Sequence, residues 1–233
     1  MGWVTPAEID AALDSAEAAI TGPKPVVLAG SGYWRVVTLL KRDRSLVNRY
    51  ADRVGAIDQA AFRSWAPIVV PFWPGTILAI LGTVLGLVLI GIAYGVDDPW
   101  NGVWFLVGTG ALLVATHGLG HLVVGTVFGI DFTVWFAGFR MPQPGIKTDY
   151  ATYLRAPARH RAWMHAAGAI VTKAIPFLLI PAALIAGIPF WAQAALIILA
   201  VAQVFTDALW SVKSSDWSKY RREMAIAKED ERV

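Results

Sequence analysis

The chain has 233 residues, of which 56% are hydrophobic and only 16% are charged. Soluble domains carry about 25% charged residues, so this balance indicates an integral membrane protein. Cysteine is absent, which excludes disulfides, thiolate metal ligands and cysteine nucleophiles. The net charge is only +3, and we expect the chain to be surrounded by membrane lipids and to have no nucleic-acid partner.

Residues 1–65 are too polar and too interrupted to be a secretory signal, and they predict an N-terminal helical region. Thr5, Pro6 and Glu8 form the pattern of a capping box, which begins a helix that runs to about Ile20. A second helical region covers about 34–64 and is amphipathic and basic. We expect it either to lie on an anionic membrane surface or to pack as a small helical hairpin under the membrane bundle.

Residues 64–96 and 174–206 carry no charge, and each region must hold at least one membrane span. We predict four spans, near 70–94, 104–126, 167–187 and 190–210, within a core of residues 66–210. Eight Lys and Arg residues precede the first span, five lie between the second and third, and six follow the fourth. The other two loops have none. The positive-inside rule therefore places both termini and the tail 211–233 in the cytoplasm. We expect the membrane to be a bacterial or archaeal plasma membrane.

Residues 131–161 differ in character from the spans. Phe132–Phe136 is β-prone, and Pro142-Gln143-Pro144-Gly145 is typical of a turn. Together these patterns predict a β-hairpin or re-entrant loop at the cytoplasmic side. The expected fold class is thus an all-α polytopic membrane protein with four transmembrane helices, this hairpin or loop, and the N-terminal helical region.

The second span holds the sequence His117-Gly118-Leu119-Gly120-His121. Two histidines four apart lie on one helix face, one turn apart, so both imidazoles can reach one metal ion. Asp207 comes out at a similar depth in the fourth span. Two histidines and one carboxylate with an open fourth position form a known zinc arrangement. We therefore predict a zinc site at His117, His121 and Asp207.

Several alternatives stay open at this point. Asp207 can instead pair with Lys173, leaving a site without metal, and the histidines can be merely hydrogen-bonded. His160 and His165 lie at the start of the third span, and either can enter the site. A b-type haem would need His117 or His121 to face His165. The chain can also be an accessory subunit that contacts transmembrane helices of other proteins in a larger complex.

The order of these elements, over about residues 100–210, resembles the site-2 protease family of intramembrane zinc metalloproteases. That family has a His-Glu-x-x-His helix, an interfacial hairpin, a helix that begins with small residues, and a helix with an aspartate ligand. The corresponding features here are the pair His117 and His121, the hairpin region 132–155, Ala166–Ala169, and Asp207. Gly118 replaces the catalytic glutamate, Ala169 stands where the family often has proline, and the Asn-Pro and Asp-Gly context of the third ligand is absent.

The missing glutamate bears directly on activity. Zinc lowers the pKa of bound water to about 7, but a peptidase also needs a general base, which contributes about 10²–10⁴-fold. Glycine cannot act as a base, and the remaining acids near the site are Asp131 and Asp149. The resemblance thus implies either a non-proteolytic, metal-binding pseudoprotease or an intramembrane protease that uses Asp131 or Asp149. If Gly118 alone prevents the site from hydrolysing peptides, the substitution Gly118→Glu should restore cleavage.

Overall fold

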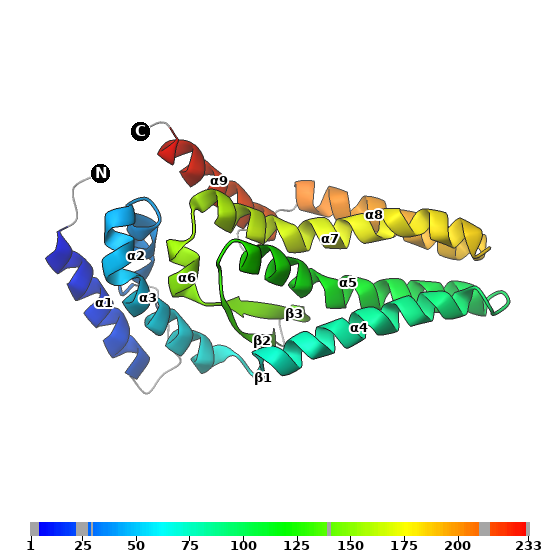
Figure 1. The fold of residues 1–233 in the computed structure, drawn as a ribbon, viewed down its shortest axis with the longest axis horizontal. Coiled ribbons are helices and arrows are strands. Elements are labelled where there is room, and N and C mark those ends of the chain that lie inside the picture. The colour runs from blue at the N-terminus through cyan, green and yellow to red at the C-terminus, as the bar shows by residue number, and fades with distance from the viewer. Residues whose placement is uncertain (1–4, 22–27, 29, 139–140, 210–214, 232–233) are drawn as a thin grey trace.

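The computed structural model describes residues 5–21, 28, 30–138, 141–209 and 215–231, without the side chains of 138, 141–143 and 206–209. It is 79% helical and contains a small three-stranded sheet. Long helices form a bundle, and the sheet, the N-terminal helices and the C-terminal helix gather at one end of it (Figure 1). We refer to this end as the sheet end. The helix-connecting loops around 94–99 and 186–189 lie at the opposite end.

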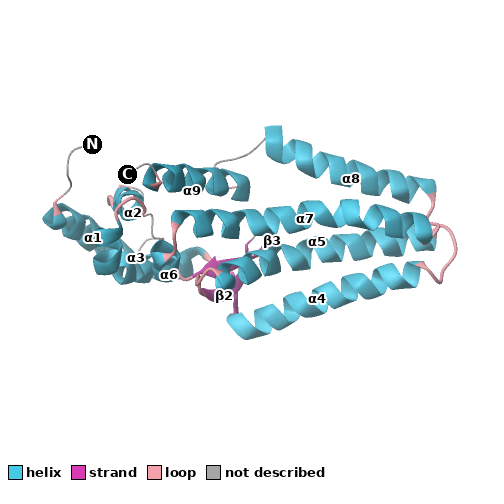
Figure 2. Ribbon diagram, turned by 45° about the horizontal axis from the view of Figure 1, so that its top comes forward, coloured by secondary structure: helices cyan, strands magenta, loops and turns pink. Residues whose placement is uncertain are grey.

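Three helices are long and apolar enough to cross a membrane: α4 (Phe72–Ala93), α5 (Trp100–Val127) and α7 (Ala158–Ile185). They confirm the spans predicted near 70–94, 104–126 and 167–187, although α7 already begins at Ala158. Helix α8 (Phe190–Leu209) runs beside them and is apolar from Phe190 to Phe205 (Figure 2). Three helices of this length and composition are typical of an integral membrane protein.

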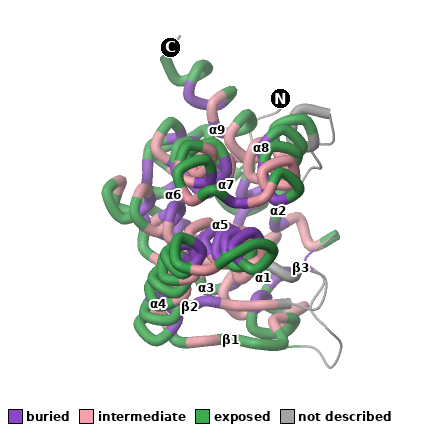
Figure 3. Tube along the Cα trace, turned by 90° about the vertical axis from the view of Figure 1, so that its right-hand side faces the viewer, coloured by how far each residue is buried: buried purple, intermediate pink, exposed green. Residues whose placement is uncertain are grey.

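The outer faces of the bundle are apolar and exposed, as lipid contact requires. Trp73, Leu78 and Leu85 of α4 are all more than half exposed. The buried residues lie inside, where α5 is covered by its neighbours (Figure 3). Helices α4 and α5 approach closely through Gly86 and Gly108, since a Cβ on Gly108 would lie 2.7 Å from the Gly86 carbonyl oxygen.

The sheet consists of β1 (Ile68–Pro71), β2 (Phe132–Gly138) and β3 (Met141–Thr148), antiparallel and in that order. Trp135 pairs with Ile146, which confirms the predicted hairpin. Strand β1 was not expected, and the fold is therefore mostly helical rather than all-α. The turn predicted at Pro142–Gly145 is also wrong, because this segment belongs to β3. As an edge strand, β3 tolerates proline, whose missing N–H costs nothing on the unpaired side.

The N-terminal region forms three helices: α1 (Pro6–Thr21), α2 (Tyr33–Leu40) and α3 (Arg44–Trp65). The predicted helix over 34–64 breaks before α3 because the side chain of Asp43 caps that helix, accepting a hydrogen bond from the Ser45 N–H at 2.9 Å. As predicted, Thr5 and Glu8 form a capping box at the start of α1.

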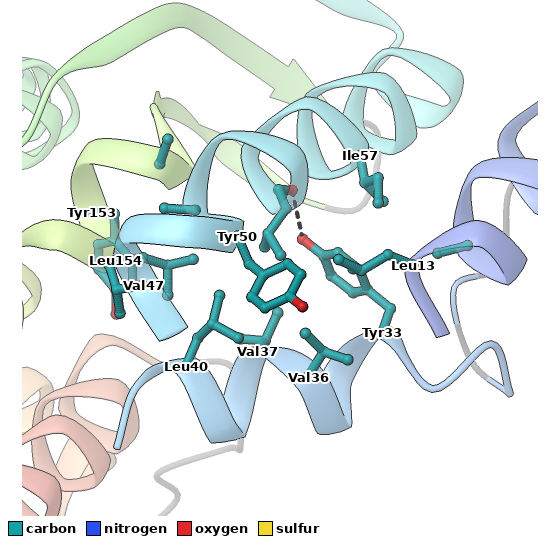
Figure 4. Close-up of a cluster of buried hydrophobic side chains, with 14 of the residues drawn as sticks. Leu13, Tyr33, Val36, Val37, Leu40, Val47, Tyr50, Ile57, Tyr153 and Leu154 are labelled. Atoms are coloured by element: carbon teal, nitrogen blue, oxygen red, sulfur yellow. Dashed lines mark hydrogen bonds between the residues drawn. The ribbon is translucent and has the colours of Figure 1, made fainter. Parts of the chain in front are cut away.

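The apolar face of this region is buried in protein, which favours the packed helical hairpin over a surface-bound helix. One core cluster joins these helices to the short helix α6 (Tyr150–Arg155) and includes Leu13, Val37 and Leu154 (Figure 4). Inside it, the Tyr33 hydroxyl donates a hydrogen bond to the Val54 carbonyl at 3.1 Å.

The C-terminal helix α9 (Asp216–Asp230) packs along α7 rather than extending as a free tail. Glu223 fixes it there: its carboxylate accepts a hydrogen bond from Arg161 of α7 at 2.7 Å and pairs with Lys41, which follows α2. Burial by itself would raise the pKa of Glu223, but the charges of Lys41 and Arg161 outweigh burial and lower it. A buried carboxylate with two cationic partners therefore ties α9 to the bundle and to the N-terminal helices.

Candidate metal site

The two histidines of α5 point to one place. Their Nε2 atoms lie 3.3 Å apart, and their rings are nearly perpendicular, with an angle of 89° between the planes. His121 is buried and His117 is partly buried. The prediction that both imidazoles converge on one point is confirmed.

The carboxylate that meets them belongs to Asp216, the first residue of α9. Its Oδ2 atom lies 3.2 Å from the Nε2 of His117 and 3.2 Å from the Nε2 of His121. Asp207, the ligand expected from the sequence, lies in α8, but its side chain is outside the described residues. The sequence signal for Asp216 is Ser215, whose side chain caps α9 and so marks a helix that begins after the last apolar segment.

The three ligand atoms form a nearly equilateral triangle with edges of 3.2, 3.2 and 3.3 Å. In a regular tetrahedron the ligand-to-ligand edge is about 1.63 times the metal-to-ligand distance, so these edges correspond to about 2.0 Å, which matches Zn–N and Zn–O bonds. His117, His121 and Asp216 can therefore hold a metal ion on one tetrahedral face and leave the fourth position for another ligand.

The hydrogen bonds around the site prepare these atoms as ligands. The Nδ1 of His121 lies 2.7 Å from the Met164 carbonyl, which can only accept, so Nδ1 carries a proton. A neutral imidazole then presents a lone pair at Nε2, the usual arrangement of a metal-binding histidine. The Nδ1 of His117 is buried and has no hydrogen-bond partner among the described residues.

Asp216 is ionised in this site. Burial alone would raise its pKa, but hydrogen bonds with His117 and His121 outweigh burial and hold the pKa below its usual value. The ammonium of Lys219 lies 3.2 Å from the other oxygen, Oδ1. Without a metal ion these hydrogen bonds to the carboxylate require protons on the Nε2 atoms, whereas a metal ion would replace those protons and bind the nitrogen lone pairs and the carboxylate together.

Glycines bring the backbones of α5 and α7 close enough to build the site. A Cβ on Gly168 would lie 2.7 Å from both Cδ2 and Cε1 of the His121 ring. A Cβ on Gly120 would lie 3.1 Å from the Ala167 carbonyl oxygen. The small residues Ala166–Ala169 of α7 therefore let this helix approach α5 closely beside His121. At Gly168 a side chain would have no room.

The ring of Trp135, from β2, occupies the space beside Gly118, which lies between the two histidines. A Cβ at this position would lie 2.6 Å from Cη2 of the indole ring. Trp135 is buried, and its N–H donates a hydrogen bond to the Thr76 hydroxyl of α4 at 3.1 Å. The Trp135 ring thus occupies the space that a glutamate side chain at position 118 would need. The expectation that Gly118→Glu alone restores a base must be corrected for this overlap.

The supporting residues expected from the sequence have other contacts. The Nε2 of His165 lies 3.0 Å from the Tyr153 hydroxyl, which donates to Glu223 at 2.9 Å, so this nitrogen serves that chain of hydrogen bonds. Lys173 donates to the Ala169 carbonyl at 3.4 Å and lies over the Trp217 ring. His160 stacks on Phe128, with ring centroids 4.2 Å apart.

The two acids proposed as alternative bases, Asp149 and Asp131, both lie beside α6. The Asp149 carboxylate caps α6 by accepting from the Thr152 N–H at 2.9 Å. Asp131 is exposed, and its backbone N–H donates to the Thr152 hydroxyl. Both acids therefore lie at the start of α6, and the metal cluster of the described residues consists of His117, His121 and Asp216.

Comparisons with protein-family models, with curated proteins and with solved structures find no match for this chain.

The close approach at Gly168 leads to a prediction about metal binding. Gly168→Ala should lower the metal content of the purified protein by roughly 10–100-fold, because the new methyl group would displace the His121 ring from its position. Elemental analysis after equilibration with the metal measures this effect. Gly110→Ala is the matched control on α5, since a Cβ there meets nothing within 4 Å. Equal metal contents in the two variants would contradict the prediction.

Proposed function

We propose that the protein is a membrane-embedded zinc protein with a core like that of the site-2 proteases, and that it does not hydrolyse peptides. The observation that carries the proposal is the triangle of Nε2, Nε2 and Oδ2 atoms, whose 3.2–3.3 Å edges fit a tetrahedral ion. Zinc is the metal for which two histidines, one carboxylate and an open fourth position are an established set.

The same geometry favours zinc over haem. Axial haem ligands approach the iron from opposite faces of the macrocycle. The Nε2 atoms of His117 and His121 instead converge from one helix to within 3.3 Å, and the Nε2 of His165 is engaged by Tyr153. The absorption spectrum of the purified protein distinguishes the two, because a zinc protein is colourless and a haem protein is not.

The lack of proteolysis follows from what surrounds Gly118. Zinc can polarise a bound water or carbonyl, but peptide hydrolysis also requires a group that takes a proton from water and delivers it to the leaving amine. Glycine offers no such group, and the Trp135 ring occupies the adjoining space. Asp149 is engaged as a helix cap. We therefore propose a binding or regulatory role for the bound metal.

The proposal includes four spans, with α8 as the fourth, and both termini in the cytoplasm. The loops that lack Lys and Arg, around Asp97 and Gly187, lie together at the end of the bundle away from the sheet (Figure 1). Helices α1 and α9 lie at the sheet end with the basic segments. This arrangement agrees with an even number of crossings and with the positive-inside rule.

Metal content tests the ligand set. The native chain should carry about one zinc ion, by the tetrahedral geometry above. Both the double variant His117→Ala, His121→Ala and the single variant Asp216→Asn should lose it, because each removes donor atoms of the triangle. Asp207→Asn is the matched control and should keep its zinc. The opposite result for the two asparagine variants would assign the third ligand to Asp207, and a metal-free native protein would refute the zinc proposal.

Cleavage of a transmembrane substrate tests the second half of the proposal. The native chain should show none, and Gly118→Glu alone should also fail, because its side chain would overlap Trp135. Gly118→Glu combined with Trp135→Ala supplies both the base and the space, and it should give chelator-sensitive cleavage. Gly118→Gln combined with Trp135→Ala is the control, since glutamine cannot accept the proton. Zinc-dependent cleavage by the native chain would overturn the non-proteolytic assignment.

Reporter fusions test the topology. Reporters inserted at Asp97 and at Gly187 should both read as external, whereas fusions to either terminus should read as cytoplasmic, because the basic residues stay on the inner side. A cytoplasmic reading at either loop would contradict the four-span arrangement.

A further inference from the structure

A cavity of about 760 Å³ lies at the sheet end, bordered by α2, β3, α6, α7 and α9. Its volume is within the range of small-molecule sites, about 300–1,000 Å³. It brings residues from the N-terminal helices together with residues of α9. The metal-site proposal makes no use of it.

Cationic side chains in the lining of the cavity far outnumber carboxylates. Five cationic side chains border it: Lys41, Arg42, Lys147, Lys219 and Arg222. Glu223 is the single carboxylate among the described residues of its lining, and that group is buried between Lys41 and Arg161. A concave wall with several cations and one buried acid concentrates positive potential, which attracts anions.

Three further carboxylates, which lie outside the lining, pair with cations of the cavity wall. Lys147 pairs with Asp58, Arg42 with Glu229 at 3.6 Å, and Lys219 with Asp216 at 3.2 Å. Each pair uses only part of the donor capacity, because an ammonium has three N–H groups and a guanidinium has five. The cavity wall therefore retains N–H donors for a further acceptor.

Hydroxyls and rings complete the lining. Thr38, Thr148 and Tyr150 border the cavity, and the Tyr150 hydroxyl makes no hydrogen bond to another described residue. Trp34, at about half exposure, and Val37 supply an apolar side. A lining that combines cationic groups, hydroxyls and apolar side chains suits an anion that carries an organic group.

We infer that this cavity binds a phosphate-bearing ligand. A phosphate group offers several acceptor oxygens and close to two negative charges, which suits a lining that draws cations from α9, β3 and the end of α2. A carboxylate, with one charge and two oxygens, would use fewer of them. The source can be a phospholipid headgroup or a soluble phosphate compound, since both present the same chemistry. This inference is independent of the metal-site proposal.

Calorimetric titration of the full chain tests the inference. The protein is held in phosphatidylcholine nanodiscs and titrated with inorganic phosphate, against sodium chloride of the same ionic strength. The double variant Arg42→Gln, Arg222→Gln should weaken phosphate binding roughly tenfold or more, because it removes two charge-assisted donors from the lining. Tyr150→Phe, which removes one hydroxyl, should weaken it by a smaller factor.

The matched control is the double variant Arg49→Gln, Arg159→Gln. It removes the same charge from exposed side chains outside this cavity and should change the affinity less than twofold. Thermal unfolding of each variant confirms that it is folded. Equal losses in both double variants would overturn the inference, because they would indicate a general charge effect.

A second arm distinguishes the two sources. The native protein and both double variants are solubilised and titrated with short-chain phosphatidic acid or with short-chain phosphatidylcholine. Selective binding of phosphatidic acid that fails only in Arg42→Gln, Arg222→Gln assigns a lipid headgroup. Binding of inorganic phosphate with no preference between the two lipids assigns a soluble phosphate compound. If neither phosphate nor phosphatidic acid binds the native chain, the inference is wrong.

Discussion

The buried carboxylate of Glu223 is the contact on which the candidate metal site depends. Arg161 of α7 and Lys41 beside α2 both bind it, so this side chain ties α9 both to the bundle and to the N-terminal helices. Removing one partner of such a group leaves an uncompensated buried charge, at a cost of about 3–5 kcal/mol. Because Asp216 begins the same helix, this ion cluster helps to position the third candidate ligand.

The candidate site also requires close packing of the helices. This packing explains Gly168 and Gly118 better than the loss of a catalytic glutamate does. Gly168 admits the His121 ring, and Gly118 admits the ring of Trp135. Trp135 is itself held by Thr76 and by its place in the sheet. The position after His117 is therefore part of a packed contact between α4, α5 and β2. A glutamate there would require the whole contact to change.

Helix α9 connects the metal cluster with the cationic cavity. Asp216 and Lys219 are one turn apart, and Lys219 contacts the carboxylate on one side while it borders the cavity on the other. A phosphate group that draws Lys219 toward itself would leave more of the Asp216 charge for the metal. Lys219 would therefore couple an anion bound in the cavity to a metal ion bound at His117, His121 and Asp216.

The sequence by itself determined the features that depend on local pattern. Uncharged apolar runs located α4, α5 and α7, and β-prone residues located the hairpin, because hydropathy and propensity act over one element at a time. The spacing of His117 and His121 likewise determined that both imidazoles share one face of a helix. Only the tertiary structure decided what meets them. Asp216 lies 95 residues beyond His121, at the start of a helix that the ion pair of Glu223 with Arg161 ties to α7. Trp135 fills the space beside Gly118 because β2 folds back against α4 and α5. Such contacts arise from packing between distant segments, and the residue pattern within a single segment cannot predict them.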